Sequence, residues 1–422
     1  MNAKKAKPRV LVLGGGFAGL EAAFYLRYKL KDKVDLTLVS ERDYFIFKPN
    51  TIYVPFGEDP EKFHVPLDKP TKKKDIAFVR GLVRDIDPER RTVMVEGSTH
   101  EYDYLVVATG AAMRAAEVPG LEDNALTLWT TDDMLRLRDG LNGIAEKAAS
   151  GERQRMLFLI PPNNRCSGPL YEIVLMTDTW LRRKKVRENV DMTWTTFEEG
   201  YIQAFGPRLN TVVTREFSER GIDGRKGYIV TEVTCDEVRY QNGEAVPYDL
   251  LVAFPPYIAK ERYGALPSDD RGFVHVDPDS RRVQGHPNIF AVGDAADFPI
   301  KQAFLALLQA DAAASHLISD IEGGKPEADF EPMSLCVMEE MNRATFASVP
   351  LTYTDDPLKP VAVDETEESA YRVGVSPIWR LGKKVLGIYV PWRFGSGEPF
   401  HAGFAWDAMD LGLKVMSKFL AK

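Results

Sequence analysis

The segment that most constrains the fold is a glycine-rich turn near the N-terminus. An apolar run at residues 9–13 leads into this turn, and a helical pattern follows at residues 20–26. The turn contains Gly14, Gly16, Phe17, Ala18 and Gly19. The order of strand, turn and helix is typical of a dinucleotide-binding unit, whose helix N-terminus meets a pyrophosphate. We expect Gly14 to permit the tight turn, Gly16 to admit the pyrophosphate, and Gly19 to let helix and strand pack closely.

A carboxylate follows at the expected distance. The second apolar run, residues 34–40, ends at Glu41. In dinucleotide-binding folds an acidic residue about 20 positions after the turn takes ribose hydroxyls. A glycine motif alone also fits a purely structural turn. Together with the strand, the helix and Glu41, it predicts nucleotide binding.

Two later apolar segments each read as a strand that ends in glycine. They are Tyr104–Gly110 and Asn288–Asp294, and we expect Asp294 to cap a helix starting near Ala295. Both segments resemble the later FAD signatures of the pyridine nucleotide-disulfide reductase superfamily. The resemblance implies FAD as the cofactor and adds to its site the residues Val83, Ala108, Thr109, Gly110, Gly293 and Asp294.

These motifs predict an α/β fold with two Rossmann-like domains, the second inserted in the first. The chain of 422 residues is long enough for two or three domains. We expect residues 1–115 and 281–328 to form the FAD-binding domain and residues 116–280 the second domain. The latter should contain a helix near 132–147. Residues 329–422 should form a C-terminal region with an amphipathic helix.

The second domain lacks the glycine-rich loop that binds NAD. Its strand-like run Met156–Ile160 leads into Pro161-Pro-Asn-Asn-Arg165, followed directly by Cys166. This substitution points away from NADH and toward sulfur chemistry.

The chain has three cysteines and no Cys-x-x-Cys motif. Cys166 precedes a probable helix, whose dipole should lower the thiol pKa and favour thiolate. Cys235 is expected to be a buried strand residue that behaves as a small hydrophobe. Cys336 lies beyond the second FAD signature.

The surroundings of two cysteines resemble one family. Residues 165–172, with Cys166 and Glu172, are similar to a block of sulfide:quinone oxidoreductases and of the flavoprotein subunit of flavocytochrome c sulfide dehydrogenases. Cys336 falls where those proteins place the partner cysteine beside the flavin. Residues 43–49 and Lys301–Ala303 are also similar, so the resemblance spans nearly the whole chain.

The resemblance implies a redox-active Cys166/Cys336 pair that hydrosulfide attacks, with two electrons passing through FAD to a quinone. Glu172 would act as general acid or base if apolar surroundings raise its pKa, or else would cap or pair near a helix start. Lys301 would polarise the flavin or quinone edge.

The sequence departs from the family at two places. A third cysteine, frequent in the family, is absent from the comparable stretch around Trp129, and a frequent histidine is replaced by Gln203-Ala204. These departures argue against covalent flavin attachment and long polysulfide growth. The expected substrate is therefore sulfide or a related small persulfide.

Composition limits the partners. A net charge of −8 argues against nucleic acid. The six histidines show no metal-ligand spacing, so no metal is expected. We see no signal peptide and no apolar run of about 18 residues. Whether the chain forms a homo-oligomer is left open.

The C-terminal segment carries aromatic residues and an apolar stripe with helical spacing, namely Trp406, Met409, Leu413, Met416 and Leu420. We expect this region to contact a membrane surface, which would make the protein peripheral to the cell membrane and otherwise cytoplasmic. The alternative is a helix docked on its own domain or on a second subunit.

Three other functions compete with sulfide:quinone oxidoreduction. A type II NADH:quinone oxidoreductase would share the first nucleotide site but needs a second glycine-rich loop. A flavocytochrome-type subunit would normally be exported. A non-enzymatic redox sensor would use the Cys166/Cys336 pair to switch partner binding.

Overall fold

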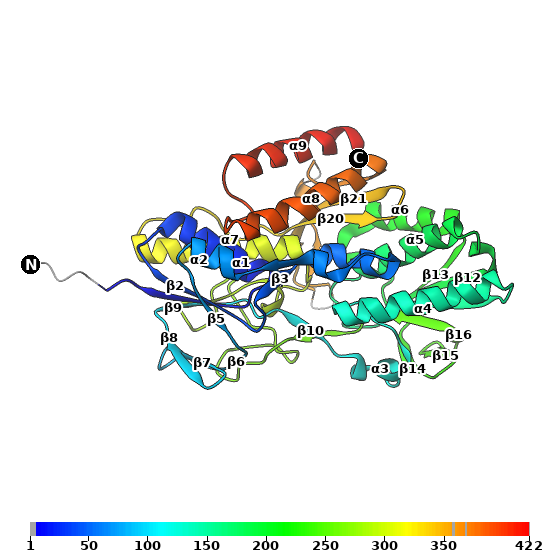
Figure 1. The fold of residues 1–422 in the computed structure, drawn as a ribbon, viewed down its shortest axis with the longest axis horizontal. Coiled ribbons are helices and arrows are strands. Elements are labelled where there is room, and N and C mark those ends of the chain that lie inside the picture. The colour runs from blue at the N-terminus through cyan, green and yellow to red at the C-terminus, as the bar shows by residue number, and fades with distance from the viewer. Residues whose placement is uncertain (1–5, 357–358, 368, 422) are drawn as a thin grey trace, which may run out of the picture.

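Two parallel sheets organise the structure, a computed structural model that describes residues 6–356, 359–367 and 369–421 (Figure 1). The first sheet has the strand order β19-β9-β1-β2-β5. Its strands are β1 (Arg9–Leu13), β2 (Asp35–Ser40), β5 (Ala77–Arg80), β9 (Tyr104–Val107) and β19 (Ile289–Ala291). Every pairing in it is parallel. This sheet carries the three predicted nucleotide-binding segments.

The second sheet is also parallel and has the order β13-β12-β11-β17. Its strands are β11 (Gln154–Ile160), β12 (Val190–Thr196), β13 (Ile222–Lys226) and β17 (Leu250–Ala253). It lies between the segments of the first sheet in the chain and beside that sheet in space (Figure 1). The predicted α/β fold with an inserted second Rossmann-like unit is thus confirmed.

Helices pack on both sheets. The first sheet is covered by α1 (Phe17–Leu30) and α7 (Ala303–Glu322), and the second is accompanied by α4 (Thr131–Ala149), α5 (Gly168–Arg183) and α6 (Gly206–Arg220). The helix α4 matches the prediction near 132–147. Thr130 Oγ1 accepts a hydrogen bond from the Asp133 N–H, and the Asp133 carboxylate accepts one from the Thr130 N–H. This capping box fixes where α4 begins.

Short elements lie within and between the two units. The helical ones are α2 (Asp68–Lys73) and α3 (Leu121–Asn124), and the strands are β3 (Tyr44–Ile46), β4 (His64–Pro66), β6 (Val83–Asp87), β7 (Thr92–Val95), β8 (Ser98–Glu101), β10 (Ala111–Met113), β14 (Val230–Val233), β15 (Glu237–Tyr240), β16 (Ala245–Pro247) and β18 (Tyr257–Ala259). Strands β10 and β18 pair antiparallel, one at each crossing between the two units. Beyond β18, the residues Tyr263, Leu266 and Val274 pack in the same apolar cluster as Leu13 and Val107. The chain therefore rejoins the first unit before residue 281.

Two local predictions were wrong. No helix starts near Ala295: Gly293–Ala295 forms one 3₁₀ turn, and α7 begins only at Ala303. Pro299 disfavours helical backbone in Phe298, the residue before it, which favours a later start for α7. Asp294 lies within the 3₁₀ turn, three residues after β19, and caps no helix.

Cys235 is exposed and lies in the turn between β14 and β15, not in a buried strand. The Thr234 Oγ1 accepts a hydrogen bond of 3.1 Å from the Glu237 N–H. This side-chain bond closes the turn, and the strand ends at Val233, two residues before the cysteine.

The C-terminal region adds an antiparallel sheet and two long helices. The strands are β20 (Met333–Glu339), β21 (Ala344–Tyr353), β22 (Val361–Val363) and β23 (Arg372–Ser376), and the helices are α8 (Pro377–Gly395) and α9 (Phe404–Leu420). Figure 1 shows α8 and α9 lying one above the other on the upper side of the molecule. No helix among the described residues is long and apolar enough to cross a membrane.

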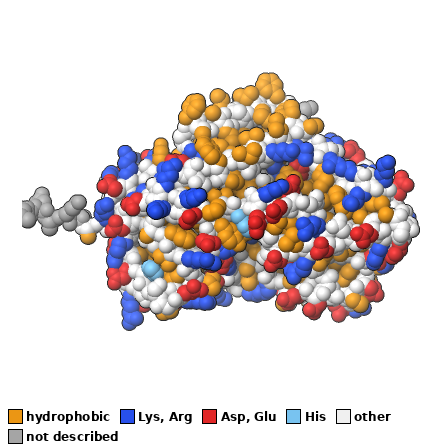
Figure 2. All heavy atoms as spheres, in the orientation of Figure 1, with side chains coloured by type: hydrophobic (Ala, Val, Ile, Leu, Met, Phe, Trp, Pro, Cys, Tyr) orange, Lys and Arg blue, Asp and Glu red, His pale blue; other side chains and the backbone are white. Residues whose placement is uncertain are grey.

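The predicted stripe of α9 packs inward. Trp406 and Met409 contact the core of the first unit, while Leu413, Met416 and Leu420 pack near Trp379. A second apolar face, which the sequence analysis did not identify, is exposed on α8 and α9 (Figure 2). Its members are Ile378, Leu381, Val385, Ile388, Trp392, Phe404, Leu411, Val415 and Phe419. We call these nine residues the apolar cap.

Candidate active site

One cavity of about 960 Å³ joins the glycine turn to the cysteines. Cys166, Cys336, Glu172 and Lys301 all line it. So do the predicted cofactor residues Gly14, Gly16, Phe17, Ala18, Glu41, Val83, Ala108, Thr109, Gly110, Gly293 and Asp294. The structure therefore brings together every predicted site residue except Gly19, which lies behind the turn.

The three glycines of the turn have the spatial roles expected of them. Gly14 has a φ of 115°, and a Cβ there would lie 2.1 Å from the Ala108 carbonyl oxygen. A Cβ at Gly19 would lie 1.8 Å from the Gly14 carbonyl oxygen, so helix and strand meet too closely for any side chain. A Cβ at Gly16 would meet nothing within 4 Å. The backbone at Gly16 is thus open toward the cavity, as a bound pyrophosphate requires.

Glu41 follows β2 and ends at the cavity, where a ribose is expected. Its carboxylate forms a 2.5 Å ion pair with Lys260 Nζ. Lys260 also lines the cavity and comes directly after β18. The sequence analysis missed it because no motif marks the residues after that strand.

Three charged groups are buried together near the end of β19. Burial raises the pKa of Asp294, and the positive charges of Lys301 and Lys48 oppose that rise. Burial lowers the pKa of each of these two lysines to about 7. The Lys301 ammonium donates to the Ala296 carbonyl oxygen and lies 3.8 Å from the centroid of the Phe273 ring. The site therefore holds two ammonium groups that titrate near neutral pH.

Lys48 is a site residue that the sequence analysis did not identify. Its Nζ lies 3.2 Å from the centroid of the Trp129 ring, a close cation–π contact. Trp129 stands in the stretch where the third cysteine of the resembled family is missing. Trp129, Phe254 and Tyr257 form an aromatic wall on this side of the cavity.

Cys166 is positioned by the loop between β11 and α5. Its N–H donates a 3.0 Å hydrogen bond to Asn164 Oδ1, and Asn164 Nδ2 donates a 2.8 Å bond to the Phe254 carbonyl oxygen. A Cβ placed on Gly168, two residues after Cys166, would lie 4.0 Å from Cys336 Sγ. Both cysteines are free thiols in this structure. Residues from α5 and β20 thus meet at one point of the cavity wall.

The expected thiolate at Cys166 is wrong for this state of the protein. Burial raises the pKa of Cys166 well above its ordinary value, and the pKa of Cys336 to about 12. The Gly168 N–H at the start of α5 favours the thiolate, as the helix argument required, but desolvation is the larger effect. Both groups are therefore thiols at neutral pH.

Glu172 lies on the buried side of α5. It has a raised pKa and also a pairing partner. Burial raises its pKa, and the nearby Lys383 opposes that rise. Its Oε1 accepts hydrogen bonds from Lys383 Nζ and, at 2.7 Å, from the Glu339 N–H. Lys383 Nζ also donates a 3.0 Å bond to the Val337 carbonyl oxygen. No motif marks Lys383, because α8 also carries Arg380, Lys384 and Arg393.

The loop after β11 offers little to a second nucleotide. Pro161 and Pro162 have no N–H group to donate to a phosphate. The side-chain amide of Asn164 donates hydrogen bonds to the Phe254 and Pro255 carbonyl oxygens. Prolines and a filled turn thus stand where a nicotinamide-nucleotide site would present open glycine amides.

Comparison with known proteins gives a consistent result. The family model of the pyridine nucleotide-disulphide oxidoreductases matches residues 8–152. The sulfide-quinone reductase of Aquifex aeolicus is 27% identical over 354 residues, which cover 78% of this chain and 80% of the relative. The external alternative NAD(P)H-ubiquinone oxidoreductase B3 of Arabidopsis thaliana is 26% identical over 329 residues, covering 70% and 56%.

A comparison with solved structures gives a neighbour of the same kind. The crystal structure of the sulfide:quinone oxidoreductase from Aquifex aeolicus superposes with a TM-score of 0.84 at 25% identity, and the match covers 97% of this chain and 96% of that one. The fold and the cavity are those of an FAD-dependent oxidoreductase, and the first part of the chain is similar to the pyridine nucleotide-disulphide oxidoreductases. Over most of its length the chain is similar to sulfide:quinone reductases.

Proposed function

We propose that this protein oxidises sulfide, or a related small persulfide, and passes two electrons through FAD to a quinone. The observation that supports the proposal is that Cys166 and Cys336 both line the cavity that also holds the FAD-type residues, with Gly168, two residues after Cys166, close to Cys336 Sγ. These cysteines come from different domains of the chain, and a buried carboxyl group, Glu172, lines the same wall.

The chemistry starts from a Cys166–Cys336 bridge. Hydrosulfide attacks one sulfur, so that one S–S bond breaks and another forms, leaving a persulfide on one cysteine and a thiolate on the other. When bound, FAD supplies a two-electron acceptor that can pass its electrons onward. Each hydrosulfide that becomes persulfide sulfur gives up two electrons and one proton. A quinone that becomes quinol takes up these two electrons, this proton and a second proton from water.

Protein groups handle charge and protons in this scheme. The buried thiols have raised pKa values, so a hydrosulfide proton or thiol proton needs an acceptor close by. Glu172 is the proposed acid and base, and its partner Lys383 holds it in place. Lys301 and Lys48 add positive charge to the cavity, which favours entry of an anion.

The quinone is expected at the opposite, apolar end of the cavity. This end is lined by residues of the C-terminal region, namely Leu386, Val390, Phe400, Trp406 and Leu413. The apolar cap lies on the same two helices, α8 and α9. We propose that the cap lies on a membrane surface, because a lipid-dissolved quinone would then reach the cavity without crossing water.

The decisive experiment is an anaerobic titration of the purified protein, followed by its visible spectrum. Sulfide should bleach the flavin band, and a soluble quinone should restore it. Replacing Cys336 by Ser should abolish bleaching by sulfide and leave FAD bound, whereas Cys235→Ser, a matched control at an exposed cysteine, should behave as wild type. Sulfide-dependent bleaching that survives in Cys336→Ser would contradict the proposed role of the pair.

A second candidate is NADH:quinone oxidoreduction, because relatives with that activity in their names match 70% of the chain. The filled loop after β11 is the observation against it. Bleaching of the flavin by NADH alone would establish this function instead. A redox sensor would be recognised by a single stoichiometric reaction with sulfide and no turnover with quinone.

A further inference from the structure

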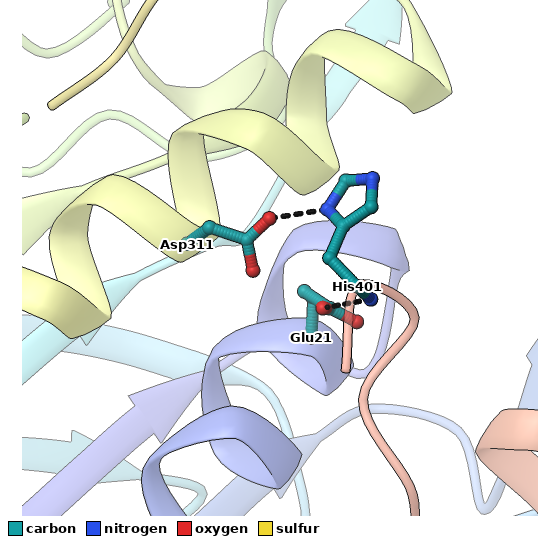
Figure 3. A group of neighbouring side chains, drawn as sticks. All are labelled: Glu21, Asp311 and His401. Carbon is teal, nitrogen blue, oxygen red and sulfur yellow. Dashed lines mark hydrogen bonds and ion pairs between the residues drawn. The ribbon is translucent and has the colours of Figure 1, made fainter. Parts of the chain in front are cut away.

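A cluster of three side chains lies outside the proposed active site, at the contact between the first unit and the C-terminal region. Glu21 comes from α1, Asp311 from α7, and His401 from the segment between α8 and α9 (Figure 3). One ligand-type atom from each residue lies within 4.8 Å of the others. Three elements that are remote in sequence thus bring two carboxylates and one imidazole to a single point.

Hydrogen bonds hold these groups in position. The Glu21 carboxylate accepts bonds from the Phe400 N–H at 2.5 Å and the His401 N–H at 3.1 Å, while the Asp311 carboxylate contacts His401 Nδ1. Two further atoms, Asp311 Oδ1 and His401 Nε2, are buried and have no hydrogen-bond partner among the described residues. The cluster therefore retains unused binding capacity in a place that water does not reach.

Burial disfavours charge in this cluster: it raises the pKa of Glu21 and of Asp311 to about 8 and lowers the pKa of His401 to about 4. Within the described part of the chain, no lysine or arginine forms an ion pair with Glu21 or Asp311. Aromatic rings surround the imidazole, with centroid distances of 4.5 Å to Phe400 and 4.6 Å to Trp406. Burying two carboxylates in apolar surroundings is unfavourable unless a positive charge accompanies them.

We propose that Glu21, Asp311 and His401 bind one divalent metal ion of the Zn²⁺ class. One imidazole nitrogen and two carboxylate oxygens form a donor set that such ions accept, whereas Mg²⁺ and Ca²⁺ prefer oxygen ligands alone. Bonds of about 2.0–2.2 Å to a shared centre separate ligand atoms by no more than about 4.4 Å, close to the observed spacing. On binding, His401 Nδ1 exchanges its contact with Asp311 for the metal.

The site would fasten the C-terminal helices to the FAD-binding unit. Glu21 lies two residues after Gly19 on the helix that follows the glycine turn, and His401 lies three residues before α9. Phe400 and Trp406, which flank His401, also line the apolar end of the main cavity. A metal here would fix that wall, a structural role that does not depend on sulfide chemistry.

Histidine spacing along the chain gave no indication of this site, because the three residues are far apart. His401 lies 90 residues from Asp311 and 380 from Glu21. Only the packing of α1 against α7, with the segment after α8 laid over both, brings them together.

The first test is the zinc content of the purified holoenzyme, measured by mass spectrometry after dialysis with and without a chelator. About one equivalent of zinc should be present or taken up, and zinc should raise the melting temperature of the chelated protein. Asp311→Asn and His401→Gln should lose this zinc. Asp407→Asn, at an exposed carboxylate on α9, is the matched control and should keep it.

X-ray absorption at the zinc edge separates this site from the cysteines. A first shell of nitrogen and oxygen at about 2.0–2.1 Å supports the cluster, and a sulfur shell near about 2.3 Å would assign the ion to thiolates and overturn the proposal. If the variants do not fold, the zinc content, melting temperature and X-ray absorption of the wild-type holoenzyme still test the proposal. Absence of zinc together with an unchanged melting temperature means that a shared proton, not a metal, neutralises the carboxylates.

Discussion

Glu172 and Lys383 are 211 residues apart in the chain and form a buried ion pair at the wall of the main cavity. Lys383→Met should leave the Glu172 carboxylate without its counter-charge, at a loss of about 3–5 kcal/mol in the free energy of unfolding at neutral pH. The pKa of Glu172, already raised by burial, should rise further. A raised folded-state pKa gives stability that is lost as pH rises, so the variant should be relatively more stable near pH 4 than near pH 8.

Urea unfolding across this pH range measures the effect. The double variant Lys383→Met, Glu172→Gln should recover most of the lost stability, because the uncompensated charge is gone. Lys384→Met, one residue further on the exposed side of α8, is the matched control and should change little. A pH-independent loss in Lys383→Met would show that its packing, not its charge, matters.

The glycines of the nucleotide turn should respond differently to alanine. Gly16→Ala should fold but bind FAD weakly, because the new methyl group meets no protein atom and occupies the approach to the pyrophosphate. Gly19→Ala should fail to fold or lose several kcal/mol, because its methyl group would overlap the Gly14 carbonyl oxygen. The ratio of flavin to protein absorbance and the melting temperature of the apoprotein separate the two effects. Equal melting temperatures for both variants would contradict this assignment.

Reaction with iodoacetamide should distinguish the three cysteines. The exposed Cys235 should be modified first in the reduced protein, and the half-buried Cys166 and Cys336, whose pKa values are raised by desolvation, much more slowly. Because the pKa of Cys336 is about 12, its reaction rate should rise about tenfold per pH unit below that value. Peptide mass spectrometry after timed labelling gives the order. Early labelling of Cys336 near pH 7 would mean that its thiolate is stabilised after all.

The apolar cap should bind lipid. Ile388→Glu and Phe419→Glu remove two of its most exposed side chains. Each should weaken binding to phospholipid vesicles by about tenfold to a hundredfold, from about 1.5–3 kcal/mol of lost burial. Met94→Glu, at an exposed apolar residue on β7, is the matched control. Vesicle co-sedimentation measures the partition. A different result would contradict membrane binding: the variants bind vesicles as the wild type does, and the wild type is a dimer in solution that the cap variants dissociate. The cap would then be the contact with a second copy of the chain.

The sequence was most informative where a local pattern determines the backbone. The glycine turn, the strands that precede Gly110 and Gly293, and the helix capped by Thr130 were all predicted, since each depends on residues a few positions apart. The match of the Cys166 segment and Cys336 to one family then placed both at one cavity.

What the sequence did not reveal depends on burial and on distant contacts. The dipole argument for Cys166 concerned only its own helix, whereas its pKa is set mainly by desolvation from surrounding elements. Lys48 and Lys383 carry no motif, and their importance comes from Trp129 and Glu172, which fold against them. On α9, helical spacing identified the packed stripe but not the exposed face beside it.

The order of strands in the first sheet has a consequence for synthesis on the ribosome. Strands β1 and β9 are made early, but β19, which covers the free edge of β9, is translated only after the entire second sheet. Until then the nascent chain exposes an unpaired, apolar strand edge of the kind that promotes aggregation. The inserted unit can complete its sheet first, so the FAD-binding unit is the last of the two to close.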